Sequence, residues 1–146
     1  MLLKYYQKLD DTISYLLAST ANEGKLLKKI FKKKPIILVD IGSNEGSYID
    51  LVDNNLSLKK IYCFEPIREL TEKIKKKYSL QKIHISNLAL SNKAKKTTFY
   101  QYAITSTSSL YKQNNTYKSL KNLKKTFKVE TDKFDKIFNK KQKIDI

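Results

Sequence analysis

The sequence predicts an α/β fold built on a mostly parallel sheet, and two observations support this prediction. Short apolar runs alternate with segments of helical periodicity over residues 36–90, in the order strand, helix, strand, helix, strand. This order is typical of βαβ units with right-handed crossovers. The first run, residues 36–41, leads directly into a turn that holds Gly42 and Gly46, two of the three glycines in the chain. Such a strand, turn and helix form ligand sites at the carboxyl end of a parallel strand.

Length and composition indicate one globular, cytoplasmic, cofactor-using domain. The chain has 146 residues, of which 40% are hydrophobic and 30% charged, enough to bury a core. No apolar run reaches the length of a membrane span, and charge begins too early for a signal peptide. Cys63 is the single cysteine, so no internal disulfide or cysteine metal cluster is expected, and we expect Cys63 in the core.

The net charge of +16 raises the question of a polyanionic partner. Arg68 is the only arginine, so 29 of the 30 basic residues are lysines (30 − 1). Nucleic-acid readers usually rely on the bidentate fork of arginine. The composition therefore argues against a nucleic-acid partner and favours a solvated lysine surface. A non-catalytic basic module that binds RNA or another polyanion stays the alternative interpretation.

Residues 1–34 read as an amino-terminal helical segment that precedes the main domain, residues 35–146. Within it, residues 25–31 resemble a short basic amphipathic helix. Such a helix binds a membrane surface in some proteins, but two turns are marginal for that. We instead expect its apolar side chains to cover one end of the sheet; they are Leu26, Leu27, Ile30 and Phe31.

The remaining elements follow from periodicity. Helices are predicted after each of the first two strands, and a hydroxyl-rich segment follows the strand at residues 96–102. In order, we expect a helix from about 48 to 55, a strand at 60–66, a helix at 67–78, strands at 82–86 and 96–102, hydroxyl-bearing residues at 105–109, an exposed loop at 111–125, a strand at 126–130, a helix carrying Phe134, Ile137 and Phe138, and the opening of a strand at 143–146.

An acidic residue follows each of the first two strands in a suggestive place. Asp40 opens the pattern Asp-x-Gly-x-Asn-x-Gly, and Glu65 closes the second strand 25 positions later (65 − 40). The carboxyl ends of neighbouring parallel strands lie side by side, so Glu65 can accept hydrogen bonds from both ribose hydroxyls of a nucleoside held over the glycine turn. A dinucleotide site would want G-x-G-x-x-G here. The spacing therefore favours a nucleoside without a pyrophosphate.

Residues 39–48 and 64–66, together with residues 87–91 and 98–100, resemble the FkbM family of class I methyltransferases, which depend on S-adenosyl-L-methionine. The resemblance implies a Rossmann-like fold and methyl transfer to a hydroxyl of a sugar or another small molecule. It implies that the turn holds the methionine part of the cofactor, that the end of the second strand holds the ribose, and that two residues after the third strand lie near the adenine. The implied cofactor-binding residues are Asp40, Gly42, Ser43, Asn44, Gly46, Glu65, Pro66, Asn87 and Leu88.

One departure from the family pattern limits the prediction. In the family the fourth strand continues into Lys-Ile-Asp-x-Glu-Gly, whereas this sequence stops at Ile146. We therefore expect the amino-terminal, cofactor-binding part of the domain, with an exposed apolar edge on the first strand. The general base is expected outside this sequence, so no catalytic residue and no metal ligand is assigned. His84 is interpreted as structural, and the serines of 106–109 either line a substrate pocket or form a plain turn.

Overall fold

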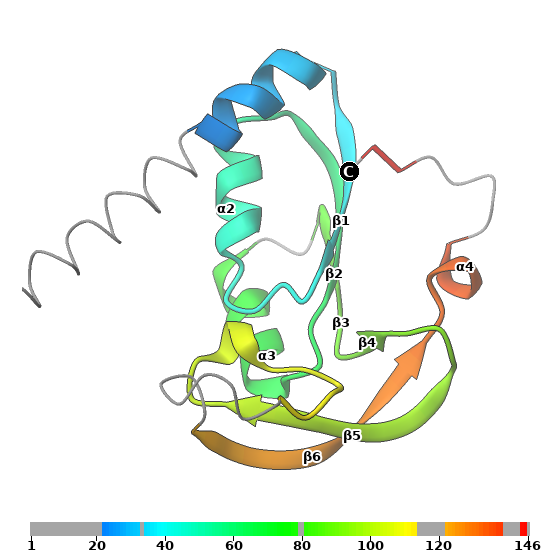
Figure 1. Cartoon of the computed structure of the whole chain (residues 1–146). Helices are drawn as coiled ribbons and strands as arrows, with labels where there is room; N and C mark the ends of the chain where they lie inside the picture. The colour runs from blue at the N-terminus through cyan, green and yellow to red at the C-terminus, as the bar shows by residue number, and fades with distance from the viewer. Residues whose placement is uncertain (1–21, 33, 79–80, 114–121, 139–143, 146) are drawn as a thin grey trace, which may run out of the picture.

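The computed structural model describes residues 22–32, 34–78, 81–113, 122–138 and 144–145. The predicted α/β class is confirmed, because a three-stranded parallel sheet alternates with helices (Figure 1). A second, mixed three-stranded sheet follows it in the chain. Within the described residues, no helix is long and apolar enough to cross a membrane.

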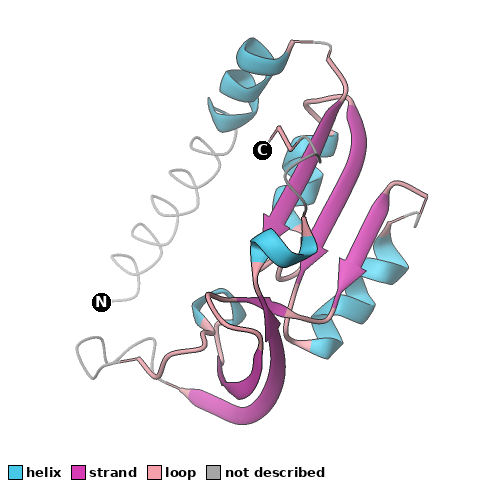
Figure 2. Ribbon diagram, turned by 90° about the vertical axis from the view of Figure 1, so that its right-hand side faces the viewer, coloured by secondary structure: helices cyan, strands magenta, loops and turns pink. Residues whose placement is uncertain are grey.

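The parallel sheet has the order β1-β2-β3. Strands β1 and β2 are each followed by a short turn and a helix that returns the chain to the start of the next strand, whereas β3 leads directly to the second sheet. Helices α2 and α3 cover the same face of the sheet, as the two perpendicular views show (Figures 1 and 2). The bounds are β1 Ile36–Ile41, α2 Ser47–Asp53, β2 Leu58–Phe64, α3 Arg68–Lys77 and β3 Ile83–Ser86.

The core lies between this sheet and its helices. Alternate residues of each strand point towards α2 and α3, as expected for a period of two, and the side chains of Ile36 and Leu38 are completely buried. The inward stripe of α2 supplies Ile49 and Val52, also completely buried. Cys63 is 0% exposed, which confirms its predicted place in the core.

The opposite face of the sheet is covered differently. Helix α4, Phe134–Ile137, lies over it, and the ring of Phe138 meets those of Tyr62 and Phe64 edge-on. Ile41 at the end of β1 remains 59% exposed. This face therefore carries exposed apolar surface near the carboxyl end of β1.

The second sheet has the order β4-β6-β5 and packs against α3. Its strands are β4 Ala89–Leu90, β5 Lys95–Tyr102 and β6 Leu123–Asp132, with a 3₁₀ turn, η1, at Thr105–Thr107. The predicted loop over 111–125 is wrong at its end, because β6 already begins at Leu123. The pairing of β6 with β5 forms a ribbon whose outer lysines are solvated, and this concealed the strand from the apolar pattern.

The helical prediction for the amino-terminal segment holds where it can be followed. Residues 22–31 are helical, whereas residues 1–21 lie outside the described residues. Leu27 and Phe31 pack on the core as expected. The same expectation for Leu26 and Ile30 is wrong, since they are 56% and 59% exposed on the side of the helix turned away from the sheet.

The end of the chain returns to the outer edge of β1. The backbone N–H of Asp145 donates to the carbonyl of Ile37 at 3.0 Å, and the backbone N–H of Ile37 donates to the Asp145 carboxylate at 3.1 Å. Residues 144 and 145 are not in a strand, and residues 143 and 146 lie outside the described residues. The edge of β1 is therefore partly covered at Ile37.

Candidate functional site

The turn between β1 and α2 is built from three residues with positive φ. Gly42 has φ +78°, Asn44 +48° and Gly46 +84°. L-residues other than asparagine and aspartate rarely adopt this region, which explains why two glycines and an asparagine occupy these positions. The turn bends away from the sheet after β1 and returns to begin α2 at Ser47.

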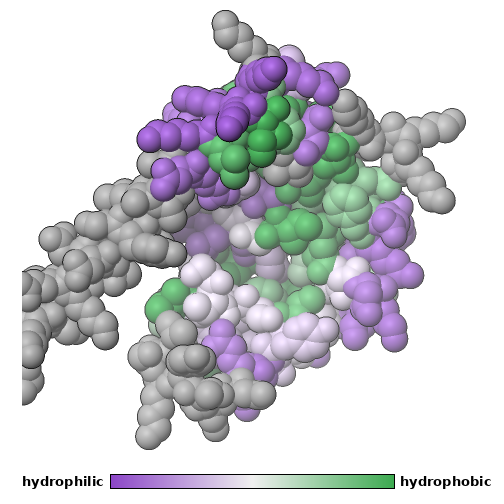
Figure 3. All heavy atoms as spheres, turned by 45° about the horizontal axis from the view of Figure 1, so that its top comes forward, coloured by the Kyte–Doolittle hydropathy of each residue, from purple (hydrophilic) through white to green (hydrophobic). Residues whose placement is uncertain are grey.

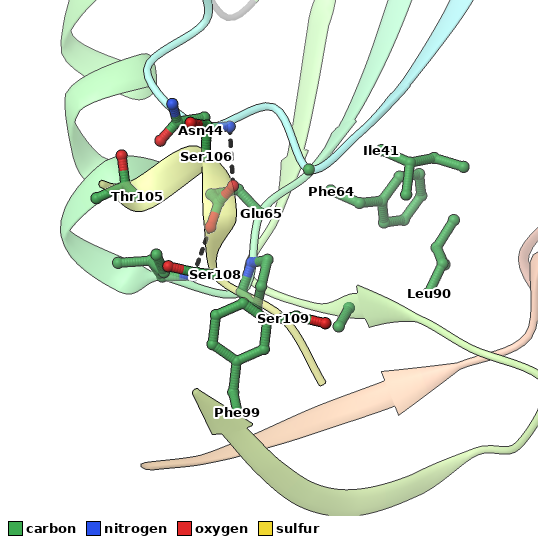
Figure 4. Close-up of a pocket in the computed structure, with 14 residues that line it drawn as sticks. Ile41, Asn44, Phe64, Glu65, Leu90, Phe99, Thr105, Ser106, Ser108 and Ser109 are labelled. Atoms are coloured by element: carbon green, nitrogen blue, oxygen red, sulfur yellow. Dashed lines mark hydrogen bonds between the residues drawn. The ribbon is translucent and has the colours of Figure 1, made fainter. Parts of the chain in front are cut away.

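Glu65 closes this turn from the neighbouring strand. Its Oε2 accepts the backbone N–H of Asn44 at 2.8 Å, and its Oε1 accepts the backbone N–H of Ile67 at 2.8 Å (Figure 4). The backbone N–H of Gly42 donates to the carbonyl of Phe64 at 2.8 Å. The ends of β1 and β2 are therefore neighbours, as the parallel order predicts, and the Glu65 carboxylate lies against the glycine turn.

Two carboxyl groups lie near each other at this edge of the sheet: that of Glu65 is buried, and that of Asp40 is half-buried. Burial raises the pKa of Glu65 above its ordinary value, although the N–H groups of Ile67 and Asn44 act in the opposite direction. The nearby charge of Asp40 raises it further. Burial likewise raises the pKa of Asp40, opposed by a hydrogen bond from Ser43. A donor or a positive charge brought to this edge would therefore be favoured.

The turn also holds buried oxygen atoms that lack a partner. Asp40 Oδ2 and Asn44 Oδ1 are inaccessible to water and find no hydrogen-bond donor among the described residues. An unsatisfied buried acceptor costs free energy and calls for an explanation. Asn44 lines the pocket beside Glu65, whereas Asp40 is not among the lining residues.

A pocket of about 300 Å³ lies beside Glu65, at the lower end of the range of ligand sites. Gly42 and Asn44 form one wall, and a Cβ placed on Gly42 would meet nothing within 4 Å, which leaves the backbone open to a ligand. The rest of the lining combines apolar side chains with a hydroxyl-rich segment; its residues are Ile41, Phe64, Pro66, Ile67, Ala89, Leu90, Phe99, Thr105, Ser106, Ser108 and Ser109.

The hydroxyl-rich segment after β5 forms the wall that faces the glycine turn. Thr105, Ser106, Ser108 and Ser109 all line the pocket (Figure 4). The segment is held by the second sheet: Ser109 exchanges two backbone hydrogen bonds with Tyr100. The structure shows the turn and places its residues along a pocket, and the prediction that this pocket holds a substrate stays a prediction.

The other residues suggested by the resemblance are placed around the pocket or outside it. Pro66 lines the pocket, whereas Ser43 and Gly46 belong to the turn behind it. Asn87 does not line this pocket; its side-chain amide donates to the carbonyls of Glu65 and Pro66 at 2.9 and 3.0 Å. Leu88 does not line it either, and the adjacent Ala89 and Leu90 do. Asn87 therefore fixes the backbone on which Glu65 stands.

A tyrosine that the sequence pattern did not single out supports the turn from behind. The Tyr78 hydroxyl contacts the carbonyl oxygen of Gly46 at 2.8 Å and the carboxylate of Asp50 at 2.5 Å. The Asp50 carboxylate also pairs with Lys77. Burial, followed by the hydrogen bond with Asp50, raises the pKa of Tyr78 to about 12. The sequence predicted Tyr78 only as the last residue of the helix at 67–78, because a contact with a residue 32 positions away leaves no local signal.

Among the described residues, no group of three or more histidine, cysteine or acidic side chains could hold a metal ion. His84 lies in the middle of β3 and stacks on the ring of Tyr62, away from the strand ends that form the pocket. Comparisons with protein-family models, with curated proteins and with solved structures find no match to this chain. The site must therefore be interpreted from its own geometry.

Proposed function

We propose that this chain binds S-adenosyl-L-methionine and is the cofactor-binding part of a class I methyltransferase similar to the FkbM family. The observation that supports the proposal most directly is the buried Glu65 carboxylate beside the open backbone of Gly42. Each Glu65 oxygen accepts one backbone N–H and keeps a lone pair, so the two oxygens can accept the two ribose hydroxyls.

The residues present fit such a ligand in two respects, and the observed sheet with its alternating helices supports the proposal in a third. The two carboxyl groups near the turn, those of Asp40 and Glu65, favour a positively charged ligand group such as the ammonium of the methionine part. The apolar lining, including Phe99, suits a flat base. The Rossmann-like methyltransferase fold extends the observed parallel sheet and its alternating helices.

The cofactor, when bound, supplies a methyl group on a positively charged sulfur. The methyl acceptor in this proposal would be a hydroxyl group of a sugar or another small molecule; S-adenosylhomocysteine would be the leaving group, and the hydroxyl proton would pass to a base that is not assigned to this sequence. The contribution of this chain is to align the two reactants and to exclude water. The hydroxyl wall that contains Ser106 and Ser108 is suited to hold a polar acceptor at the mouth of the pocket.

Calorimetric titration with S-adenosylhomocysteine tests the proposal. The change Glu65→Gln keeps the volume of the side chain but removes its charge, and we expect affinity to fall at least about tenfold, the loss of one charge-assisted hydrogen bond. The matched control is Glu45→Gln in the same turn, where the carboxylate is exposed and bonded to Lys73. It should leave affinity unchanged.

Two results would overturn the proposal. One is the absence of S-adenosylhomocysteine binding by the unaltered chain. The other is an equal loss of affinity in the Glu65 and Glu45 variants, which would mean that the turn responds to net charge and not to the buried carboxylate. Circular dichroism of both variants establishes that each is folded.

A further inference from the structure

The helix at residues 22–31 is anchored on one face and leaves another face uncovered. Leu27 and Phe31, four residues apart, pack on the core. Gly24 lies so close to Asn55 that a Cβ there would come within 2.8 Å of the Asn55 amide nitrogen. The helix is therefore held tightly against the end of α2, and the orientation of its exposed side chains is fixed.

Its uncovered face has two adjacent rows of side chains. Leu26 and Ile30 are four residues apart, so they share one row, and they are 56% and 59% exposed. Lys25 and Lys29 form the neighbouring row, and both are exposed. Figure 3 shows a hydrophobic patch over this end of the molecule, bordered by hydrophilic side chains.

The charge of this face is strongly positive, and among its lysines only Lys34, beyond the helix, has an ion pair in the described part of the chain, with Asp145. Residues 22–34 contain six lysines and one acid, Glu23. Glu23 is hydrogen-bonded with Tyr48. None of the ion pairs found among the described residues involves Lys25, Lys28, Lys29 or Lys32.

We propose that this face, made of Leu26, Ile30 and the lysines beside them, docks on an anionic lipid bilayer. The lysines are complementary in charge to anionic headgroups, and the two aliphatic side chains enter the boundary between headgroups and acyl chains. A polyanion such as RNA would satisfy the lysines but would leave Leu26 and Ile30 in water. The exposed aliphatic row is the reason to favour a membrane surface. The docking is peripheral and reversible, because one short helix buries little apolar area.

Co-sedimentation of the full chain with lipid vesicles tests this proposal. We expect binding to vesicles that contain phosphatidylserine, weak binding to phosphatidylcholine alone, and release by added salt. Leu26→Ser with Ile30→Ser should weaken binding about tenfold by removing the inserted side chains. The matched control changes two aliphatic residues exposed elsewhere, Ile104→Ser with Leu123→Ser, and should bind as the unaltered chain does.

A second pair of variants tests the position of the charge. Lys25→Gln with Lys29→Gln should weaken binding about thirtyfold, at roughly 1 kcal/mol for each lysine near an anionic surface. Lys112→Gln with Lys124→Gln removes the same charge from exposed positions near the second sheet and should have less than a twofold effect. The proposal is overturned by failure to bind phosphatidylserine vesicles, by equal effects of the two lysine pairs, or by vesicle binding that ignores Leu26 and Ile30. Preferential binding to RNA, unaffected by the aliphatic pair, would also overturn it.

Discussion

Gly42 and Gly46 lie in one turn and share a positive φ, yet their surroundings differ. A Cβ on Gly42 would meet nothing within 4 Å, because this residue faces the pocket. A Cβ on Gly46 would come within 3.0 Å of the Tyr78 ring. The first glycine leaves room for a ligand, whereas the second leaves room for the protein itself.

This contrast extends to the residues on either side. The strand half of the turn, residues 40–44, contains unpartnered buried oxygens and adjoins the Glu65 carboxylate. The helix half, residues 46–50, has its polar groups paired with Tyr78 and Lys77 of the following helix. Among the described residues, the strand half therefore keeps buried oxygens without a hydrogen-bond partner. The helix half is held in place by contacts with Tyr78 and Lys77 and supports the turn.

The largest effect on stability is expected from Gly46→Ala. Left-handed backbone costs an alanine about 1–2 kcal/mol, and displacing the Tyr78 ring adds about 1–3 kcal/mol. Thermal unfolding should show Tm lower by roughly 10 °C. The double variant with Tyr78→Ala should regain the part due to crowding but not the part due to strain. Strictly additive losses would show that the ring does not press on this position.

Gly42→Ala should have the opposite profile. Only the backbone strain of about 1–2 kcal/mol applies, because the new methyl group meets no neighbour. The methyl enters the pocket, and we expect the affinity for S-adenosylhomocysteine to fall about tenfold, roughly the effect of a misplaced methyl group in a binding pocket. Calorimetry and thermal unfolding of the same sample separate the two effects. If Gly46→Ala weakens binding more than Gly42→Ala does, the assignment of the two halves is reversed.

Tyr78→Phe tests the support alone. It removes the hydroxyl that contacts Gly46 and Asp50 but keeps the ring, and unfolding should become easier by about 1–2 kcal/mol. Tyr111→Phe is the control, since Tyr111 is 79% exposed. Denaturant unfolding with an unchanged m-value measures both. A cost below about 0.5 kcal/mol for Tyr78→Phe would mean that the hydroxyl does not hold the turn.

The strand half was largely predictable from the sequence, and the helix half was not. The run from Ile36 to Ile41 leads directly into Gly42, and Glu65 follows its own apolar strand, so local patterns indicate each of them. Tyr78 reaches the turn only through the packing of α3 on α2. No local pattern encodes that contact.

The far wall of the pocket shows the same limitation. Phe99, Leu90 and Ser108 reach the site because the second sheet packs against α3, and sequence periodicity does not specify how two sheets are oriented. The high density of serines after β5 indicated a pocket wall or a turn, but it did not indicate which face of the turn would line the pocket. Sequence patterns therefore predicted which residues are polar or have unusual backbone conformations. Which of these residues lie together depends on tertiary packing, which those patterns do not encode.

The smallest effect, and the most discriminating, is the response of the two halves to pH. Burial raises the pKa of Glu65, so on acidification this carboxylate is protonated above pH 4.5, its ordinary value. Ligand affinity should therefore fall on acidification, beginning above pH 4.5, while the folded state is relieved of a buried charge and is not weakened by it. For Asp50, burial acts to raise the pKa, but the hydrogen bonds from Lys77 and Tyr78 outweigh it and hold the pKa below the ordinary 3.8.

The stability that Asp50 contributes is thus fully present above pH 3.8 and is lost only as the pH falls through its lowered pKa. Calorimetry at pH values above 4.5 should show that affinity for S-adenosylhomocysteine declines on acidification in the unaltered chain and stays nearly constant in Glu65→Gln. Unfolding measurements should show the contribution of Asp50, obtained by comparison with Asp50→Asn, unchanged until the pH drops below about 4. If affinity declined equally in the Glu65 variant, the titrating group would lie elsewhere, with Asp40 in the same half of the turn the first to test by Asp40→Asn.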